Sequence, residues 1–232
     1  MQAVVFDMDG LLLDTERLSR ASWLAGGRDL GFELPLTVLT AIIGRRRPEV
    51  EAQFVAALGD GFPVQDLYAR HAAHYQRALL AATPSELRKP GVVSVLDWLD
   101  NAGIPYAIAT STLAAGAAKK LALADLSDRF PIVVTGEQVA RSKPAPDIYV
   151  EAARRLGVSA EHCVAFEDSD LGLEAAMTAG MRAVAVPDLK PVPPEITSRV
   201  LATLRSLEEA VLMLERLDTG THSRKKEGGP PA

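Results

Sequence analysis

The chain has 232 residues, of which 48% are hydrophobic and 24% are charged, and its formal net charge is −5. This composition suits a globular protein with one large domain, or with a core and a smaller insert, and the acidic balance argues against nucleic-acid binding, which needs a basic face. A single cysteine, Cys163, excludes an intrachain disulfide, and no apolar run approaches the length of a membrane span.

The first expected element is a buried strand that ends in two carboxylates. The apolar run from Ala3 to Phe6 contains β-branched and aromatic residues, and Asp7, Asp9 and Gly10 follow it. Unpaired charge at the end of a core strand is costly, so these carboxylates need a bound cation, a shared proton or a lysine as partner. A purely structural network of charges is the less favoured alternative.

Residues 15–87 have a helical pattern without a convincing strand. Thr15 is expected to cap a first helix, and three further helical stretches, at 34–43, 48–58 and 64–80, are separated by glycine and proline. We therefore predict a small helical domain inserted after the first strand. Its arginine run at 45–47 suits either a solvated surface or a contact with substrate phosphate, for which Arg47 is the candidate.

Strands and helices alternate from about residue 88 onward. Such alternation is typical of βαβ units, and it predicts an α/β, Rossmann-like parallel sheet with helices on both faces, built from residues 1–14 and 88–217. Residues 218–232 are polar and end in glycine and proline, so we expect a disordered tail. The expected later strands are 106–109, 132–134, 163–166 and 183–186, and the expected helices are 90–101, 113–123, 147–156, 171–179 and 201–217.

Polar residues recur at the C-terminal ends of these strands, which is the edge where open α/β sheets bind ligands. Thr110 and Ser111 follow the second strand, and Glu167 and Asp168 follow the fourth. Lys143 comes from a loop that two prolines stiffen. Alone, a threonine here would be an ordinary helix cap and a lysine an ordinary surface residue. Together with the first two aspartates they predict one site.

This set of residues suits phosphoryl transfer. Asp7 can attack phosphorus and form an aspartyl-phosphate, and Asp9 can protonate the leaving oxygen and later deprotonate water. A hard cation such as Mg²⁺ would bridge carboxylate and phosphate oxygens. The candidate metal ligands are Asp7, Asp9, Glu167 and Asp168. The candidate ligands of the substrate phosphate are Thr110, Ser111 and Lys143.

The same residues resemble the four motifs of the haloacid-dehalogenase-like hydrolase superfamily. The run Asp7-Met8-Asp9-Gly10 resembles the first motif, Thr110 the second, Lys143 the third, and residues 167–172 the fourth. The resemblance implies that Asp7 is the nucleophile and Asp9 the acid and base. It also implies that Mg²⁺ is held by Asp7, the Asp9 carbonyl and Asp168, and that residues 15–87 form a mobile helical cap.

Within that superfamily the chain is similar to the β-phosphoglucomutase and sugar-phosphate phosphatase subgroup. Mutase relatives usually carry a histidine where this chain has Ser19, and an asparagine in the second-motif loop where this chain has residues 112–114. We therefore expect a phosphatase for a sugar phosphate or a nucleoside monophosphate, with mutase activity as the alternative.

Three other functions fit the sequence less well. A phospho-receiver domain has its acceptor aspartate later in the chain and no cap. An inactive binding module would not need the complete acid and base set. A dehalogenase uses an attacking aspartate but neither Mg²⁺ nor the paired Asp9.

The remaining expectations concern location and partners. The N-terminus leads straight into a strand without a basic leader, so we expect a cytoplasmic enzyme. Its partner would be a small phosphorylated metabolite, with neither nucleic acid nor a membrane involved, and a monomer is the default. His71 and His74, in the helical insert, are expected to be packing or surface residues.

Overall fold

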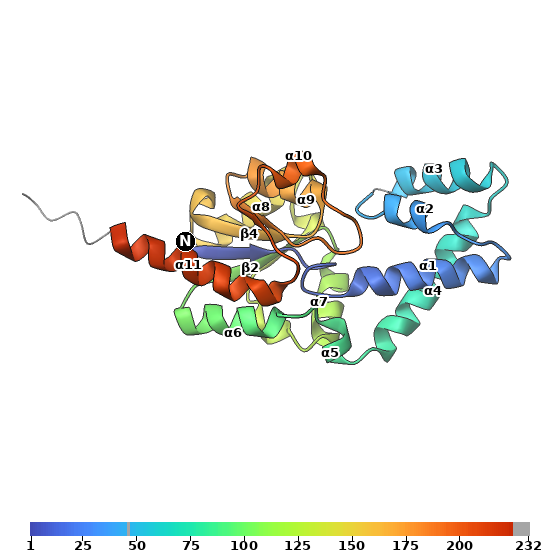
Figure 1. Ribbon diagram of the computed structural model, residues 1–232. Helices are drawn as coiled ribbons and strands as arrows, with labels where there is room; N and C mark the ends of the chain where they lie inside the picture. Colours follow the sequence, from blue (N-terminus) through green and yellow to red (C-terminus); the bar gives the residue numbers. More distant parts are fainter. Residues whose placement is uncertain (46, 225–232) are drawn as a thin grey trace, which may run out of the picture.

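The computed structural model describes residues 1–45 and 47–224. Its core is a six-stranded sheet in the order β3-β2-β1-β4-β5-β6, and every neighbouring pair of strands is parallel. The first strand therefore lies in the middle of the sheet (Figure 1). The strands are β1 (Ala3–Phe6), β2 (Tyr106–Thr110), β3 (Val133–Thr135), β4 (Cys163–Glu167), β5 (Arg182–Ala185) and β6 (Ala202–Thr203).

Helices cover both faces of this sheet, because its central strands are apolar on both sides. In β1, Val4 and Phe6 pack with α6, α7 and α11 on one face, whereas Ala3 and Val5 pack with α8, α9 and α10 on the other. The core helices are α6 (Val92–Ala102), α7 (Ala114–Leu123), α8 (Asp147–Leu156), α9 (Asp170–Thr178), α10 (Pro194–Thr197) and α11 (Ala210–Arg224). This architecture confirms the predicted α/β fold class.

The register of the strands brings their C-terminal ends to one edge. Phe6 is paired with Ile108 of β2 and with Phe166 of β4. The residues that follow these strands therefore emerge side by side, and all of the sequence-predicted polar positions except Lys143 and Arg47 lie there.

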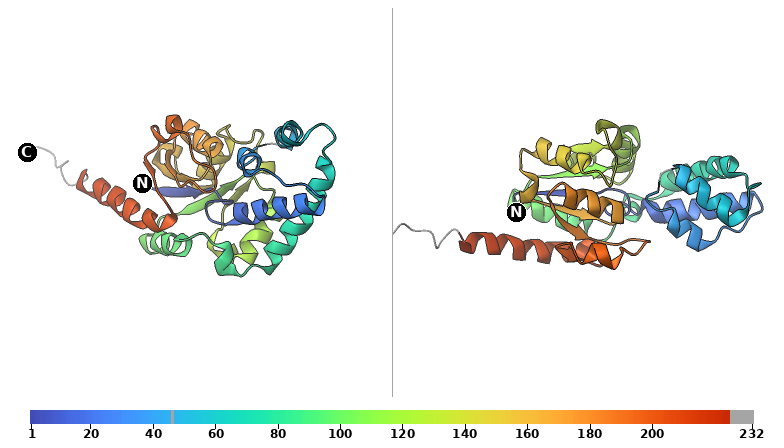
Figure 2. Two further views of the ribbon diagram at one scale, coloured as in Figure 1. Left: turned by 45° about the vertical axis from the view of Figure 1, so that its right-hand side comes forward. Right: turned by 90° about the horizontal axis from the view of Figure 1, so that it is seen from above.

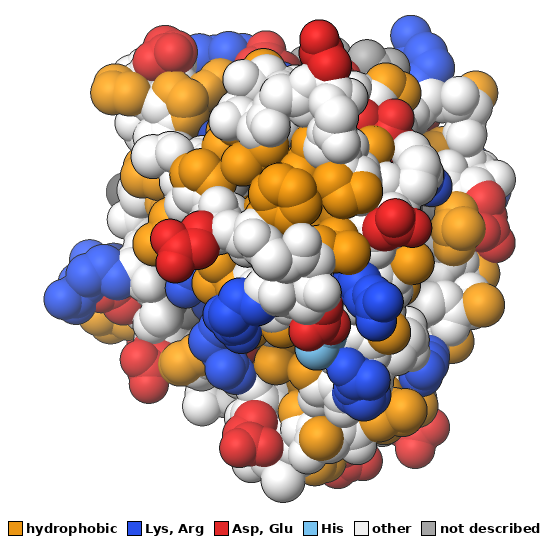
Figure 3. Space-filling view, turned by 90° about the vertical axis from the view of Figure 1, so that its right-hand side faces the viewer, with side chains coloured by type: hydrophobic (Ala, Val, Ile, Leu, Met, Phe, Trp, Pro, Cys, Tyr) orange, Lys and Arg blue, Asp and Glu red, His pale blue; other side chains and the backbone are white. Residues whose placement is uncertain are grey.

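The inserted helices form a separate lobe beyond this edge of the sheet (Figures 1 and 2). The lobe has its own apolar cluster around Phe54 and Leu67, and its long helices α1 and α4 pack along each other. Seen from its outer end, the molecule shows hydrophobic side chains beside a group of basic ones (Figure 3). The helices are α1 (Thr15–Asp29), α2 (Leu36–Ala41), α3 (Arg47–Leu58), α4 (Val64–Ala81) and α5 (Pro84–Leu87).

Two chain segments connect the lobe to the core, and they are hydrogen-bonded to each other. The Asp14 amide donates to the Leu87 carbonyl at 2.8 Å, and the Lys89 amide donates to the Leu12 carbonyl at 3.0 Å. These hydrogen bonds lie beside the boundaries predicted for the helical insert, 14/15 and 87/88, which stay a prediction. We refer to residues 15–87 as the cap.

Three local expectations differ from the structure. Thr15 is the first residue of α1 rather than its N-cap, and its hydroxyl donates to Asp9. Asp14 is the N-cap, but its carboxylate pairs with Arg17 and makes no cap bond. The expected helix at 201–217 is replaced by the short strand β6 and by α11, which begins at Ala210.

The third difference concerns the tail predicted at 218–232. Helix α11 continues to Arg224, and residues 225–232 lie outside the described residues. No helix in the described part of the chain is long and apolar enough to cross a membrane.

Candidate active site

Lys143 joins two of the predicted carboxylates. Its ammonium lies 2.5 Å from Asp7 Oδ1 and 2.5 Å from Glu167 Oε1, and it also donates to the Ala109 carbonyl at 3.1 Å. The loop that carries Lys143 is held in place where Arg141 pairs with Asp147 at 2.7 Å, at the start of α8. The carboxylates predicted at the ends of β1 and β4 therefore do contact the lysine of the proline-flanked loop.

Glu167 is fully buried, and donors surround its carboxylate. Besides Lys143, the Tyr149 hydroxyl donates to Oε1 at 2.8 Å. The amide and the hydroxyl of Ser169 both donate to Oε2, at 3.0 and 2.9 Å. Both oxygens of this buried carboxylate are therefore already engaged by protein groups.

The charges around Asp7 and Lys143 influence each other. Burial raises the pKa of Asp7 to about 7 even though Lys143 lowers it, and the charge of Glu167 raises it further. Burial would lower the pKa of Lys143, but the two carboxylates outweigh that effect and raise it above its ordinary value. Lys143 is therefore a cation at neutral pH, and it faces two carboxylates with a single positive charge.

Asp168 adds a third carboxylate at this edge. It is 8% exposed and lies against Gly10, where an added Cβ would overlap with its carboxylate. Gly10 has φ +86°, a conformation that favours glycine. Burial raises the pKa of Asp168 well above its usual range, and Glu167 and Asp7 raise it further.

The donor set at Asp7 and Asp168 fits a hard divalent cation. Two carboxylates whose pKa values are raised by burial and by neighbouring carboxylates are short of positive charge, and Mg²⁺ prefers carboxylate oxygens. Within residues 1–45 and 47–224, no group of three or more Asp, Glu, His or Cys side chains has the geometry of a metal site. The ligand set that the resemblance implies also includes the main-chain carbonyl of Asp9.

Asp9 is held by three side chains that the sequence did not predict as site residues. Oδ1 accepts from the Thr15 hydroxyl and from the Lys120 ammonium, each at 2.6 Å. Oδ2 accepts from the Thr112 hydroxyl at 2.6 Å. Burial acts to raise the pKa of Asp9, but Lys120 and these hydrogen bonds outweigh it, so the pKa lies below its ordinary value.

These carboxylates open into a cleft of about 480 Å³ between the core and the cap. Thr110 and Ser111 line it at the end of β2, and the Thr110 hydroxyl accepts from the Thr112 amide at 3.1 Å. The predicted phosphate ligands thus share one wall with Lys143. The cap contributes Thr15, Glu16, Ser19, Ile43, Gly44, Arg45, His71 and Tyr75.

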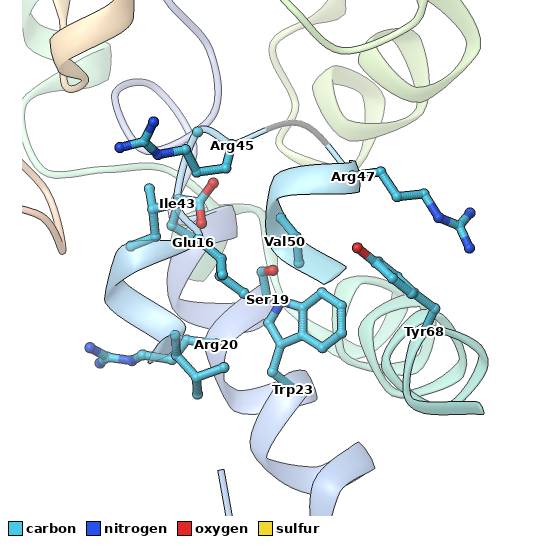
Figure 4. Close-up of a pocket in the computed structure, with 12 residues that line it drawn as sticks. Glu16, Ser19, Arg20, Trp23, Ile43, Arg45, Arg47, Val50 and Tyr68 are labelled. Carbon is cyan, nitrogen blue, oxygen red and sulfur yellow. The ribbon is translucent and has the colours of Figure 1, made fainter. Parts of the chain in front are cut away.

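Arg47 lines a second, smaller pocket of about 260 Å³ inside the cap. Its guanidinium bonds Glu51 at 2.9 Å and Gln65 at 2.5 Å, and its Cζ lies 4.4 Å from the centre of the Tyr68 ring. In Figure 4 it points away from Arg45, which lines both pockets. The substrate contact expected of Arg47 stays a prediction.

The residues that sequence reasoning missed come mostly from helices. Lys120 lies in an alanine-rich helix, where a lysine is normally assigned to the surface, and Tyr149 lies in the amphipathic helix α8. Which side of such a helix faces the site depends on packing rather than on spacing. The run of hydroxyl residues 110–112 after β2 was the one available signal for Thr112.

A sequence model described as haloacid dehalogenase-like hydrolase matches residues 1–180. The chain is 34% identical over 186 residues to the phosphorylated carbohydrates phosphatase of Thermotoga maritima, which covers 79% of this chain and 84% of that protein. It is 34% identical over 183 residues to fructose-1-phosphate phosphatase YqaB of Escherichia coli, with 79% and 95% covered. It is 32% identical over 200 residues to the β-phosphoglucomutase of Bacillus subtilis, with 83% and 86% covered.

Solved structures show the same architecture. A HAD family hydrolase from Deinococcus radiodurans, with bound phosphate and sodium, superimposes with a TM-score of 0.79 at 28% identity, covering 93% of this chain and 96% of that one. A putative β-phosphoglucomutase from Thermotoga maritima gives a TM-score of 0.76 at 30% identity, with 93% and 99% covered.

Proposed function

Because the chain belongs to the haloacid dehalogenase-like hydrolase family, we propose that it is a Mg²⁺-dependent phosphatase that hydrolyses a phosphorylated sugar through an aspartyl-phosphate on Asp7. The observation that carries this proposal is the group of Asp7, Lys143 and Asp168 at one end of a cleft lined by hydroxyl groups. Relatives named as phosphatases of phosphorylated carbohydrates support the choice of substrate class.

In this proposal Lys143 and the residues after β2 bind the phosphate group. The Lys143 ammonium offsets the charge of the phosphate and of Asp7 as the two anions approach. Thr110 and Ser111 lie on the same wall of the cleft and would donate to the remaining oxygens. Glu167 keeps Lys143 in position, and because both its oxygens already accept from protein donors, we assign it this positioning role rather than that of a direct metal ligand.

Asp9, which Lys120 and its hydrogen bonds keep ionised, would first take up a proton from solvent as the substrate binds. Asp7 would then attack phosphorus while Asp9 gives that proton to the departing sugar oxygen, and Asp9 would take a proton back from the water that hydrolyses the aspartyl-phosphate. Asp9 must exchange part of its contact with Thr15, Thr112 and Lys120 to reach that oxygen, since these three groups occupy both of its carboxylate oxygens. Movement of the cap relative to the core would accompany this exchange, because Thr15 belongs to the first cap helix.

A magnesium ion would be held by Asp7, Asp168 and the main-chain carbonyl of Asp9. When bound, it would reduce the repulsion between carboxylate and phosphate and polarise the phosphoryl group. Removal of bulk water by the cap would strengthen every charge interaction in the cleft.

The test is phosphate release from a panel of hexose phosphates and nucleoside monophosphates, with Mg²⁺ and with EDTA. The proposal predicts Mg²⁺-dependent release, with the highest kcat/KM among the sugar phosphates. The panel includes β-glucose 1-phosphate with a bisphosphate activator, read for isomerised product. Isomerisation with little phosphate release would show a mutase rather than a phosphatase. The absence of any reaction with every substrate would contradict both activities.

A further inference from the structure

Ser19 of α1 and His71 of α4 lie together on the cap side of the cleft. Ser19 Oγ is 3.2 Å from His71 Nε2, and both residues line the cleft that contains Asp7, Asp9 and Lys143. The hydrogen bond joins two different helices of the cap, 52 residues apart in sequence. The pair therefore occupies the wall that the organic part of a bound phosphate ester would face.

Aromatic neighbours fix the His71 ring. The imidazole stacks on Trp23 with ring centres 3.8 Å apart and an interplanar angle of 16°, and on Tyr75 with ring centres 5.8 Å apart. Burial lowers the pKa of His71 to about 4, so the ring is neutral at neutral pH. A neutral, immobile imidazole orients the Ser19 hydroxyl as a hydrogen-bond partner without adding charge to the cleft.

The Ser19 hydroxyl has further bonding capacity. A hydroxyl can donate once and accept twice, and within the described part of the chain the bond with His71 is the one that Ser19 Oγ makes. Ser19 also lines the smaller pocket, where Figure 4 shows its hydroxyl between Glu16 and Trp23. The Ser19 hydroxyl can therefore form further hydrogen bonds with a ligand that enters either pocket.

We propose that Ser19, positioned by His71, hydrogen-bonds a hydroxyl of the sugar moiety of the substrate. This inference rests on the proposed phosphatase function and adds a specificity contact to it. The pair is uncharged, so it would recognise a polyhydroxylated alcohol rather than a second anionic group. An ester without further hydroxyls would bind the core residues alone.

The experiment compares two esters on the full-length enzyme in Mg²⁺. One is the hexose phosphate on which the unmodified enzyme is most active, and the other is p-nitrophenyl phosphate, whose organic part has no hydroxyl. The variants are Ser19→Ala, His71→Phe, which keeps an aromatic ring but removes the nitrogen, and the double variant. The matched controls are Ser22→Ala, whose hydroxyl bonds the Leu18 carbonyl, and His74→Gln, whose ring pairs with Asp29 at the surface.

Each single variant is expected to lower kcat/KM for the hexose phosphate by about 3- to 10-fold, the effect of one neutral hydrogen bond. The double variant should fall no further than the lower single variant, because the two residues act on one contact. Activity on p-nitrophenyl phosphate should stay within about 2-fold, which also shows that the variants fold, and the controls should match the unmodified enzyme on both esters.

An equal loss on both esters, or no loss on the hexose phosphate, would overturn the specificity contact while leaving the phosphatase in place. Additive losses in the double variant would separate Ser19 from His71 and overturn the positioning role. No phosphate release by the unmodified enzyme from either ester would instead overturn the proposed function.

Discussion

At the scale of single residues, two lysines bind different carboxylates of the site. Lys143 bridges Asp7 and Glu167 at the end of the central strands, whereas Lys120 holds Asp9 from helix α7. The consequence is that the two aspartates of the first motif have different electrostatic surroundings. The pKa of Asp7 is raised by burial, and that of Asp9 is lowered by its lysine and hydrogen bonds against the effect of burial.

Lys120 is therefore expected to position Asp9 for proton transfer. Lys120→Met should lower kcat by about 10- to 100-fold, within the range of a general acid and base that has lost its orientation, and Lys120→Arg should recover part of that loss. The matched control is Lys119→Met, since Lys119 bonds Gln76 at the surface and does not contact Asp9. Steady-state kinetics on one substrate checks this, and equal effects at 119 and 120 would refute it.

His71 makes stability depend on pH in a defined window. Its pKa is about 4 in the folded protein and 6.5 in an ordinary environment, so between these values the unfolded chain binds a proton that the folded protein does not. The contribution of His71 to the free energy of unfolding is therefore fully present above about pH 6.5 and is lost as the pH falls toward 4.

His71→Phe should remove this dependence. Between pH 7 and pH 4 the unmodified protein should lose about 2 kcal/mol more unfolding free energy than the variant, a figure reduced because the ring remains partly accessible. Denaturant unfolding of both proteins at several pH values measures the difference. Parallel stability curves would show that His71 titrates normally.

At the scale of the elements, helix α9 packs its first turn directly on the end of β4. Gly172 lies over Glu167, where an added Cβ would overlap with the carboxylate, and the Gly172 amide donates to the Ser169 hydroxyl at 3.1 Å. The absence of a side chain at 172 is what lets the helix reach the buried carboxylate.

Gly172→Ala should accordingly destabilise the protein by about 2–3 kcal/mol, although alanine favours helices, because the overlap displaces a buried carboxylate from its donors. Gly61→Ala is the control, since nothing lies within 4 Å of a Cβ there, and it should change stability by less than about 1 kcal/mol. Thermal unfolding distinguishes them, and a stable Gly172→Ala protein would argue against the packing described.

The elements themselves were mostly predictable from the sequence. The apolar runs located β1, β2 and β4, because burial imposes that pattern directly, and the cap helices were recognised as helical stretches separated by glycine and proline. Strand β6 was missed, since two residues at a sheet edge carry no periodic signal. The hydroxyl of Thr15 was assigned to a cap, but the tertiary contact with Asp9 takes it instead.

Whether a site residue could be predicted from the sequence depended on where it lies relative to the strands. The residues that immediately follow β1, β2 and β4 could be placed together, because parallel strands end at one edge. Thr112, Lys120 and Tyr149 could not be placed, because the rotation of a helix on the sheet follows from packing. The substrate contact expected of Arg47 stays a prediction. For Glu167 we propose the positioning of Lys143 in place of the expected metal ligation, and both residues have partners within the protein.

At the scale of the whole molecule, a cleft between core and cap contains Asp7 and Asp168, two carboxylates that lack enough positive charge. Mg²⁺ should therefore stabilise the folded protein without any substrate. At a concentration 100-fold above Kd the gain is about 2.7 kcal/mol, or roughly 5–10 °C in Tm for a chain of this size. Asp168→Asn should remove most of this shift, and EDTA should reverse it. A Tm that does not respond to Mg²⁺ would contradict the metal site.

The cytoplasmic location and the monomeric state stay predictions.

The most direct test of the proposed mechanism is whether the phosphoryl group is transferred to Asp7. Enzyme quenched during turnover of a sugar phosphate is treated with borohydride, which reduces an acyl phosphate to an alcohol, and the peptide containing residue 7 is examined by mass spectrometry. The proposed mechanism predicts reduction at Asp7 with substrate and Mg²⁺, none with EDTA, and a loss of turnover of at least about 10³-fold in a folded Asp7→Asn protein. Reduction at another residue, or turnover by Asp7→Asn, would contradict it.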